Sequence, residues 1–342
     1  MALAGELEIE RAVAGLKAAA DSTRLRILLL LAEGELNVKD LTNILGQSQP
    51  RISRHVKLLG EAGLIERVRE GSWVFCRLAD GPGGALARAL VQSVNANDPV
   101  YVRDRQRAEE VKAEREMAAQ AYFRAHAADW DRIRALHVSE AEVEAAMREA
   151  LGTERVELLL DLGTGTGRTL ELFSDIYDRG IGIDLNQSML AYARAKLRRT
   201  GLDHVQVRHG DIYNLSFPDG VADAIVMHQV LHFLSDPSRA IKEAGRVLAP
   251  GGRLLIVDFA PHQLEFLRDE FAHERLGFSS AQVSQWLADA GLSLVSSRDL
   301  PPPAGSESGK LTVSLWLATR PVVRQRSLAR RSVARQSMES SL

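Results

Sequence analysis

A glycine-rich stretch that directly follows an apolar run places the strongest constraint on this chain. Residues 157–160 read Glu-Leu-Leu-Leu and are expected to end a buried strand, which Asp161 closes. Three glycines follow at alternate positions: Gly163, Gly165 and Gly167. Glycine lets the backbone turn tightly and approach a ligand with no side chain in the way. With a helix expected from about Arg168, the sequence predicts a strand–loop–helix unit of an α/β sheet that binds a ligand at the turn.

The glycine spacing argues against a nicotinamide or flavin dinucleotide as the ligand. The dinucleotide pattern needs a third glycine at position 168, which is Arg168 in this chain. The spacing is instead G-x-G-x-G, with Asp161 two residues upstream of the first glycine. A dinucleotide is therefore the weaker interpretation.

The stretch from Asp161 to Gly167 resembles motif I of the class I S-adenosylmethionine (SAM)-dependent methyltransferases, and further segments match that family in order. Asp184 ends a second expected strand, 21 residues after Gly163, where an acceptor for ribose hydroxyls is expected. The remaining matches are expected strands at residues 205–212, 222–227 and 247–258. The resemblance implies a Rossmann-like α/β domain with a mostly parallel seven-stranded sheet.

The same resemblance implies that SAM is the cofactor and indicates which residues contact it. Asp161 and the glycines would lie by the methionine moiety, Asp184 by the ribose, and Asp211 by adenine. The full candidate set is Asp161, Gly163, Gly165, Gly167, Asp184, Leu185, Met189, Asp211, Ile212 and His228. For Met189, packing in the core is an equal alternative.

The methyl acceptor side is less constrained by the sequence. His228 and His232 follow the fourth expected strand, at the edge where α/β sheets bind ligands, so either is a candidate general base. A structural role is the alternative for each. The candidate acceptor face comprises Trp130, His262, Glu265 and His273.

Three of those acceptor residues are expected on one helix. Spacings of three and four place His262, Glu265 and His273, together with Asp269, on one stripe of a helix over 262–273. A solvated helix face is the alternative, and no metal site is predicted. This region is similar to ubiquinone/menaquinone-type methyltransferases, a resemblance that leaves the substrate open.

The first eighty residues predict a second kind of domain. Helices are expected at 8–20, 23–32, 38–45 and from Ser48 to about residue 62, followed by two alternating strands within 64–78. The fourth helix carries apolar residues on one face and Arg51, Arg54 and Lys57 on the other. This order predicts an α+β winged helix-turn-helix whose basic helix enters the major groove of DNA.

The passage from Ser48 to Ile65 resembles the recognition helix of ArsR-type winged-helix repressors. The resemblance implies a homodimer that binds double-stranded operator DNA. The candidate DNA-binding residues are Ser48, Gln49, Arg51, Ser53, Arg54, His55, Lys57, Arg67 and Arg69. The metal-sensing branch has a cysteine cluster where this chain has none, and Cys76 is its single cysteine. DNA binding is therefore carried over from the resemblance, and metal sensing is not.

The whole chain is predicted to divide into four parts. These are a DNA-binding domain at 1–80, a helical connector and dimerisation region at 81–150, a methyltransferase domain at 151–319, and a disordered basic tail at 320–342. Residues 98–128 are expected to form a solvated helical strut. One cysteine and apolar runs too short to cross a bilayer suggest a cytoplasmic protein with no membrane partner.

Two functions remain open on these grounds. One is a transcriptional regulator that senses SAM or S-adenosylhomocysteine (SAH). The other is an active methyltransferase of a small molecule, with a DNA-binding domain that controls its own expression. A nucleic-acid methyltransferase is disfavoured, because residues 227–230 read Met-His-Gln-Val where the exocyclic-amine enzymes carry an Asn/Asp-Pro-Pro-aromatic signature.

Overall fold

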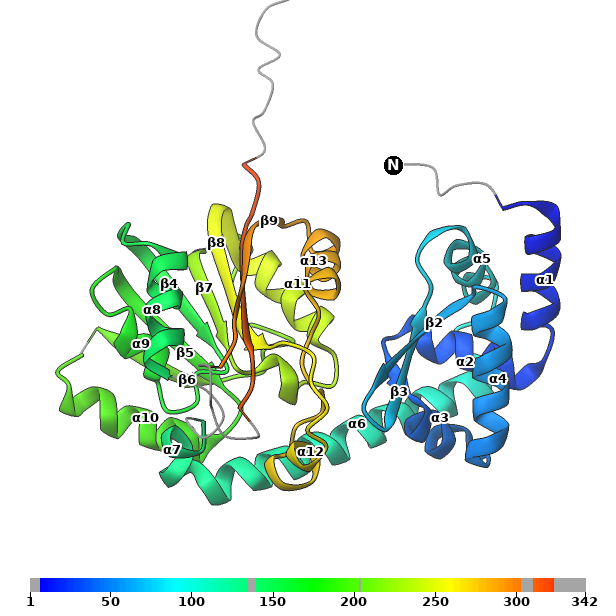
Figure 1. The fold of residues 1–342 in the computed structure, drawn as a ribbon, viewed down its shortest axis with the longest axis horizontal. Helices are drawn as coiled ribbons and strands as arrows, with labels where there is room; N and C mark the ends of the chain where they lie inside the picture. Colours follow the sequence, from blue (N-terminus) through cyan, green and yellow to red (C-terminus); the bar gives the residue numbers. More distant parts are fainter. Residues whose placement is uncertain (1–6, 135–139, 203, 303–309, 323–342) are drawn as a thin grey trace, which may run out of the picture.

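The computed structural model describes residues 7–134, 140–202, 204–302 and 310–322. It has two lobes, which the 28-residue helix α6 (Pro99–His126) connects along their lower edge (Figure 1). Among the described residues, no helix combines the length and apolar character that a membrane crossing requires.

The N-terminal lobe is a winged helix-turn-helix. Its elements are α1 (Ile9–Ala19), α2 (Ser22–Ala32), β1 (Leu36–Asn37), α3 (Val38–Leu45), α4 (Gln49–Glu61), β2 (Ile65–Glu70), β3 (Trp73–Leu78) and α5 (Gly81–Gln92). The strands form an antiparallel sheet in the order β1-β3-β2. Asp21 caps α2, because its side chain accepts a hydrogen bond from the backbone N–H of Arg24.

The Gly81–Gly84 segment has the composition of a break in the chain, yet it forms the first turn of α5. Pro82 suits a first helical turn, where its missing N–H costs no hydrogen bond. The glycines allow close packing, since a methyl group on Gly84 would lie 1.6 Å from the carbonyl oxygen of Ala79.

The C-terminal lobe is the predicted Rossmann-like domain. Its strands are β4 (Val156–Leu162), β5 (Tyr177–Asp184), β6 (Val205–His209), β7 (Ala222–His228), β8 (Leu248–Phe259), β9 (Ser293–Leu300) and β10 (Val313–Thr319). Its helices include α8 (Glu140–Leu151), α9 (Arg168–Leu172), α10 (Gln187–Arg199), α11 (Pro237–Val247) and α13 (Ser280–Asp289). The sheet order is β6-β5-β4-β7-β8-β10-β9. The first five strands in this order run parallel, and β10 is antiparallel to both of its neighbours, as expected for the last pair.

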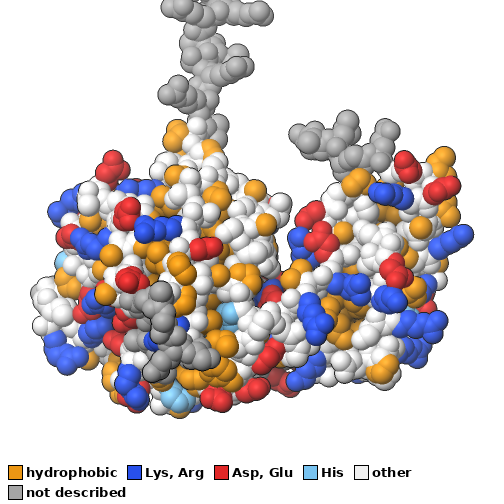
Figure 2. Space-filling model, viewed as in Figure 1, with side chains coloured by type: hydrophobic (Ala, Val, Ile, Leu, Met, Phe, Trp, Pro, Cys, Tyr) orange, Lys and Arg blue, Asp and Glu red, His pale blue; other side chains and the backbone are white. Residues whose placement is uncertain are grey.

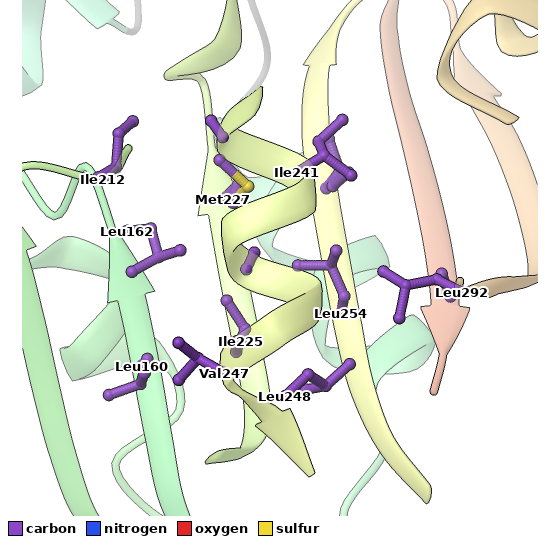
Figure 3. Close-up of a cluster of buried hydrophobic side chains, with 14 of the residues drawn as sticks. Leu160, Leu162, Ile212, Ile225, Met227, Ile241, Val247, Leu248, Leu254 and Leu292 are labelled. Atoms are coloured by element: carbon purple, nitrogen blue, oxygen red, sulfur yellow. The ribbon is translucent and has the colours of Figure 1, made fainter. Parts of the chain in front are cut away.

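A continuous apolar core fixes the parallel strands beneath their helices. Helix α11 packs over β7 and β8, with Ile241 and Val247 directed toward Ile225 and Leu254 (Figure 3). These side chains are fully buried. The core holds the strands in register, so that the loops at their carboxyl ends share one edge of the sheet.

Helix α6 is the predicted helix, but it is not a solvated strut along its whole length. At one end, Tyr101, Asp104 and Ala108 are buried against the N-terminal lobe, and Asp104 pairs with Arg26 of α2 at 2.5 Å. Toward its other end, Gln120 accepts a hydrogen bond from the side chain of Asn186 in the C-terminal lobe. One rigid helix therefore contacts both lobes.

Candidate functional site

The glycine loop has the geometry that its sequence requires. All three glycines have positive φ: 77° at Gly163, 52° at Gly165 and 81° at Gly167. A methyl group on Gly163 would lie 2.3 Å from the Val230 side chain. At the end of β4, the Asp161 carboxylate is buried and accepts a hydrogen bond from the Thr164 hydroxyl at 2.6 Å. The loop is thus held by backbone conformation and by its own polar contacts.

Asp184 joins the end of β5 to the glycine loop. Its carboxylate accepts hydrogen bonds from the backbone N–H groups of Gly165 and Asn186, both at 2.8 Å. Burial raises the pKa of Asp184 above its ordinary value, although these backbone bonds act in the opposite direction. A half-buried carboxylate beside the loop is suited to accept hydrogen bonds from ligand hydroxyls.

A large pocket lies at this edge of the sheet and brings most of the predicted cofactor residues together. It is lined by Gly163, Gly165, Asp184, Leu185, Met189, Asp211, Ile212 and His228, among others. Asp161 and Gly167 do not line it and instead support the loop from behind. The pocket also includes Glu116, Gln120 and Phe123 of α6, which the sequence analysis did not place there.

Trp130 lies over the glycine loop. A Cβ atom built on Gly165 would be 3.5 Å from the indole nitrogen of Trp130. The indole packs edge-on against Phe123, with ring centroids 5.3 Å apart. Trp130 lines both this pocket and a smaller neighbouring cavity, so it lies at the boundary between two ligand-sized spaces.

The two candidate catalytic histidines occupy different surroundings. His228 ends β7 and lines the large pocket. His232 is buried in the turn after β7, and its Nδ1 lies 2.7 Å from a carboxylate oxygen of Asp258. Asp258, which sequence reasoning missed, ends the buried apolar part of β8 and is fully buried.

The predicted stripe of polar residues on a helix over 262–273 is wrong. The helix there, α12, covers only Phe266–Phe271 and ends at Ala272, which has a left-handed φ of 58°. His262 and His273 therefore lie outside it. His273 stacks on Phe259 near His232, while Glu265 points away from this cavity and toward the N-terminal lobe. Only Trp130 and His273 of the predicted acceptor face line the cavity beside His232.

The predicted DNA-binding residues of α4 lie on its outer face. Ser48, Gln49, Arg51, Ser53, Arg54 and Lys57 are exposed, and His55 is partly buried. Burial lowers the pKa of His55, opposed by the nearby Asp21 carboxylate. Basic side chains gather over this part of the N-terminal lobe (Figure 2). Arg67 and Arg69 are exposed on β2, and the Arg69 side chain donates to the carbonyl oxygen of Gly71 at the tip of the hairpin, at 3.1 Å.

The tip of the β2–β3 hairpin is held by the C-terminal lobe, an arrangement that the sequence analysis did not anticipate. The Glu70 carboxylate pairs with Arg275, and the Arg268 side chain donates to the Glu70 carbonyl oxygen at 3.2 Å. The backbone N–H of Ser72 donates to Glu265 at 2.5 Å. We call the set Glu35, Glu70, Glu265, Arg268 and Arg275 the interlobe cluster. Arg275 is fully buried in it.

Comparisons with known proteins agree with the assignment of one domain to each lobe. Residues 160–256 match the family model of a methyltransferase domain, and residues 21–67 match that of bacterial regulatory proteins of the arsR family. An uncharacterized methyltransferase, YcgJ, of Bacillus subtilis (strain 168) is 34% identical over 137 residues, which are 38% of this chain and 53% of that protein.

Two further relatives are informative. The ubiquinone/menaquinone biosynthesis C-methyltransferase UbiE of Pectobacterium carotovorum subsp. carotovorum (strain PC1) is 37% identical over 116 residues, 33% of this chain and 46% of that protein. The chain thus spans about half the length of these curated relatives. A chain in the structure of the Haloferax volcanii Trm112 methyltransferase activator with a methyltransferase superposes with a TM-score of 0.50 at 22% identity, covering 58% of this chain and 97% of that chain. This last likeness concerns the fold alone.

Proposed function

We propose that this chain, which carries an ArsR-family helix-turn-helix segment followed by a methyltransferase domain, is a DNA-binding transcriptional regulator that responds to SAM or SAH. The observation that carries the proposal is the physical link between the cofactor pocket and the DNA-binding lobe. Two connections make that link, helix α6 and the interlobe cluster.

The first connection runs along α6. Arg115 donates to Glu274 of the C-terminal lobe at 2.5 Å and also pairs with Asp40 of α3, which packs beside the recognition helix. The next residue, Glu116, lines the cofactor pocket, as does Gln120 one turn later. A ligand that shifts this part of α6 would therefore act directly on the helix-turn-helix.

The second connection runs through the turn after β7. The carbonyl oxygen of His232 accepts hydrogen bonds from the backbone N–H groups of Glu274 and Arg275, at 2.9 and 3.0 Å. The neighbouring Phe233 lines the cofactor pocket, and Arg275 holds Glu70 at the tip of the wing. A movement of this turn on ligand binding would be transmitted to the wing through two contacts, the backbone hydrogen bond between His232 and Arg275 and the pair of Arg275 with Glu70.

SAM fits the residues that line the pocket. Asp184 would hold the ribose hydroxyls, Asp211 and Ile212 the adenine, and the open backbone at Gly163 and Gly165 the methionine moiety. Leu185, Met189 and His228 complete the wall. When bound, SAM supplies a methyl group on a positively charged sulfur, and SAH is the product that lacks it.

An exposed apolar surface on α1 supports operator binding by a homodimer. Ile9, Val13 and Leu16 form an apolar stripe on α1 and are 83%, 42% and 49% exposed. Apolar side chains in such a stripe are suited to pack against a second copy of the chain. A dimer would present two α4 helices to successive major grooves of a palindromic site. A DNA target and a free, buried Cys76 are consistent with a cytoplasmic location.

The regulatory claim can be tested without knowing the operator in advance. Duplexes selected by the full-length protein from a random library would yield the site, and its affinity would then be measured with SAM, with SAH and with neither. We expect a palindromic site whose affinity changes at least about fivefold with one ligand, the lower end of common allosteric couplings. Arg51→Ala and Arg54→Ala should abolish selection. Equal affinity under all three conditions would contradict ligand sensing.

A second candidate function is turnover, and one observation favours it. A cavity lined by His232, whose ring pairs with the buried Asp258, adjoins the cofactor pocket. Pure sensing has no need of a base beside the cofactor, whereas methyl transfer to a weak nucleophile does. The two functions are compatible, because an enzyme can regulate its own gene.

A further inference from the structure

A small aromatic cavity opens beside the cofactor pocket. Its lining comprises Tyr122, Trp130, Phe233, Phe259, Phe271 and Ile133, with Gln229, His232 and His273 as the polar members. Trp130, Gln229 and Phe233 line the cofactor pocket as well. The cavity has an empty volume of about 350 Å³, which includes space open to solvent. A molecule here would lie next to the cofactor.

One polar group at the boundary of the two spaces is a hydrogen-bond donor without a partner. Gln229 is 6% exposed, and its side-chain nitrogen has no hydrogen-bond partner among the described residues. The backbone of this residue also has a φ of 51°, a conformation that residues other than glycine rarely adopt. Its backbone N–H is fixed to the Val257 carbonyl oxygen at 2.7 Å. A buried donor held in this way is suited to bind an oxygen atom of a ligand.

The opposite polar group is a potential base. The Nδ1 atom of His232 lies 2.7 Å from Asp258 Oδ1. Asp258 is itself fixed, since it accepts hydrogen bonds from the backbone N–H groups of Phe259 at 2.7 Å and of His232 at 3.3 Å. A carboxylate that accepts from Nδ1 sets the tautomer of a neutral imidazole, which leaves Nε2 as the nitrogen that can take a proton. The His232 ring is also fixed by packing against Phe233 and Phe259.

The lining restricts the charge of the ligand. Among the described residues that line the cavity, none is Asp, Glu, Lys or Arg, so this part of the wall offers no counter-charge to a phosphate, a carboxylate or an ammonium group. A nucleic-acid base attached to its phosphates fits such a wall poorly. The aromatic walls favour a flat, uncharged ring.

We propose that this cavity is the methyl-acceptor site, and that its ligand is a single-ring, uncharged compound with a weakly acidic hydroxyl of the phenol type. The inference rests on the proposed function, in that SAM occupies the adjoining pocket. Gln229 binds and orients the ligand, and the His232–Asp258 pair removes the hydroxyl proton.

The transfer step balances with the groups present. The hydroxyl proton moves to Nε2 of His232, and Asp258 stabilises the resulting imidazolium. The oxygen forms a bond to the methyl carbon while the bond from that carbon to sulfur breaks, and sulfur keeps the electron pair. The products are the methyl ether and SAH, and the imidazolium returns its proton to solvent. No oxidant or metal is needed for this balance.

Other titratable groups face His232 and enter its pH dependence. Asp258 approaches it from β8, His273 from the segment after α12 with ring centroids 4.2 Å apart, and Tyr122 from α6 across the cavity. Burial raises the pKa of Tyr122, so it remains a neutral hydroxyl at ordinary pH.

The test uses the full-length protein with para-cresol, a phenol that is uncharged at neutral pH, as the probe. Binding to the SAH-loaded protein would be followed by equilibrium dialysis, and conversion to para-methylanisole with SAM by chromatography. Benzoate and benzylamine, which carry a negative and a positive charge, serve as comparison ligands. We expect the phenol alone to bind and to be methylated. Gln229→Ala should weaken phenol binding at least about tenfold.

His232→Gln should lower kcat by about a hundredfold or more while SAH affinity stays within about twofold, because removal of a general base has effects of this size. The acid limb of the pH–rate profile should also disappear. Asp258→Asn, which conserves shape, should give the same direction of change. His204→Gln, an exposed histidine far from the cavity, is the matched control and should leave the rate unchanged.

The outcomes separate this inference from the function on which it rests. Failure of the wild-type protein to bind SAH would contradict the proposed function. Binding of SAH without binding of the phenol, or stronger binding of benzoate or benzylamine, would overturn the acceptor assignment. Wild-type turnover in His232→Gln with an unchanged pH profile would overturn the role of the base.

Discussion

The guanidinium of Arg275, in the C-terminal lobe, lies against the carboxylate of Glu70 at the tip of the wing, with Nε 3.0 Å from Oε1. Arg275 also donates to Glu35 at 2.8 Å and lies 4.0 Å from the centroid of the Phe75 ring. All of these partners belong to the N-terminal lobe. The wing is thus fixed to the methyltransferase domain rather than free in solution. Contact of its tip with DNA would require this cluster to open.

Replacement of Arg275 should be costly to stability. Arg275→Met leaves the Glu35 carboxylate without its cation and the Glu70 carboxylate with Arg268 alone, at 3.4 Å, in a buried site; breaking a buried pair in this way costs about 3–5 kcal/mol. Arg155→Met is the matched control, because its pair with Asp178 at 2.7 Å is exposed and should contribute less than about 1 kcal/mol. Denaturant unfolding would measure both variants. Equal losses would show that the cluster does not hold the lobes together.

The apolar stripe on α1 predicts the oligomeric state. Val13→Asp places a charge in the centre of the stripe and should convert a dimer into a monomer in sedimentation analysis, since desolvating an unpaired charge at an interface is unfavourable. Arg11→Asp changes a residue on the opposite side of the same helix and should leave the dimer intact. A wild-type monomer at micromolar concentration would contradict this role for the stripe.

Two glycines with similar positive φ are expected to respond differently to alanine: Gly46, at the end of α3, and Gly163, in the glycine loop. Gly46→Ala meets no neighbour within 4 Å and suffers only from its φ of 63°, which costs about 1–2 kcal/mol. Gly163→Ala has a similar φ of 77° but also places its methyl group 2.3 Å from Val230. We expect a larger loss of stability than in Gly46→Ala, and loss of SAM affinity in Gly163→Ala alone. Thermal melting with and without SAM distinguishes the two contributions.

The ionisation of Asp184 predicts how SAM affinity depends on pH. The ionised carboxylate is the form that accepts hydrogen bonds from two ribose hydroxyls, and burial raises its pKa. Affinity should therefore be complete above that raised pKa and fall as the pH drops through it, at a higher pH than an exposed aspartate would titrate. Calorimetry at a series of pH values from neutral downward would detect the decline. Asp184→Asn, which cannot ionise, should bind weakly at every pH in this range, and a wild-type affinity with no pH dependence would refute the assignment.

Features that depend on local sequence were predictable. The apolar run ending at Asp161 and the glycines after it identify the central strand and its loop, because both signals lie within a few neighbouring residues. The cap at Asp21 and the strand ending at Asp184 were found for the same reason. Most of the cofactor pocket follows from these elements, since parallel strands bring their carboxyl ends to one edge.

Features that depend on distant contacts were not predictable. The chain has 43 Lys and Arg residues and 45 Asp and Glu residues, so nothing local selects Glu70 as the partner of Arg275, 205 positions away. The helix expected over 262–273 is confined to Phe266–Phe271, and its end is set by Ala272, which adopts a left-handed conformation that its residue type does not favour. The pairing of His232 with Asp258 likewise depends on the register of β7 and β8 rather than on either local sequence.

The assignment of the large pocket as the cofactor site is tested most directly by calorimetric titration of SAM and SAH into the full-length protein and into its Asp184→Ala variant. We predict that the wild-type protein binds both ligands in the micromolar range that is ordinary for enzyme ligands, and that the variant loses this binding. Absence of binding of either ligand to a well-folded wild-type protein would contradict the assignment of the pocket, and with it both the sensing and the transfer functions.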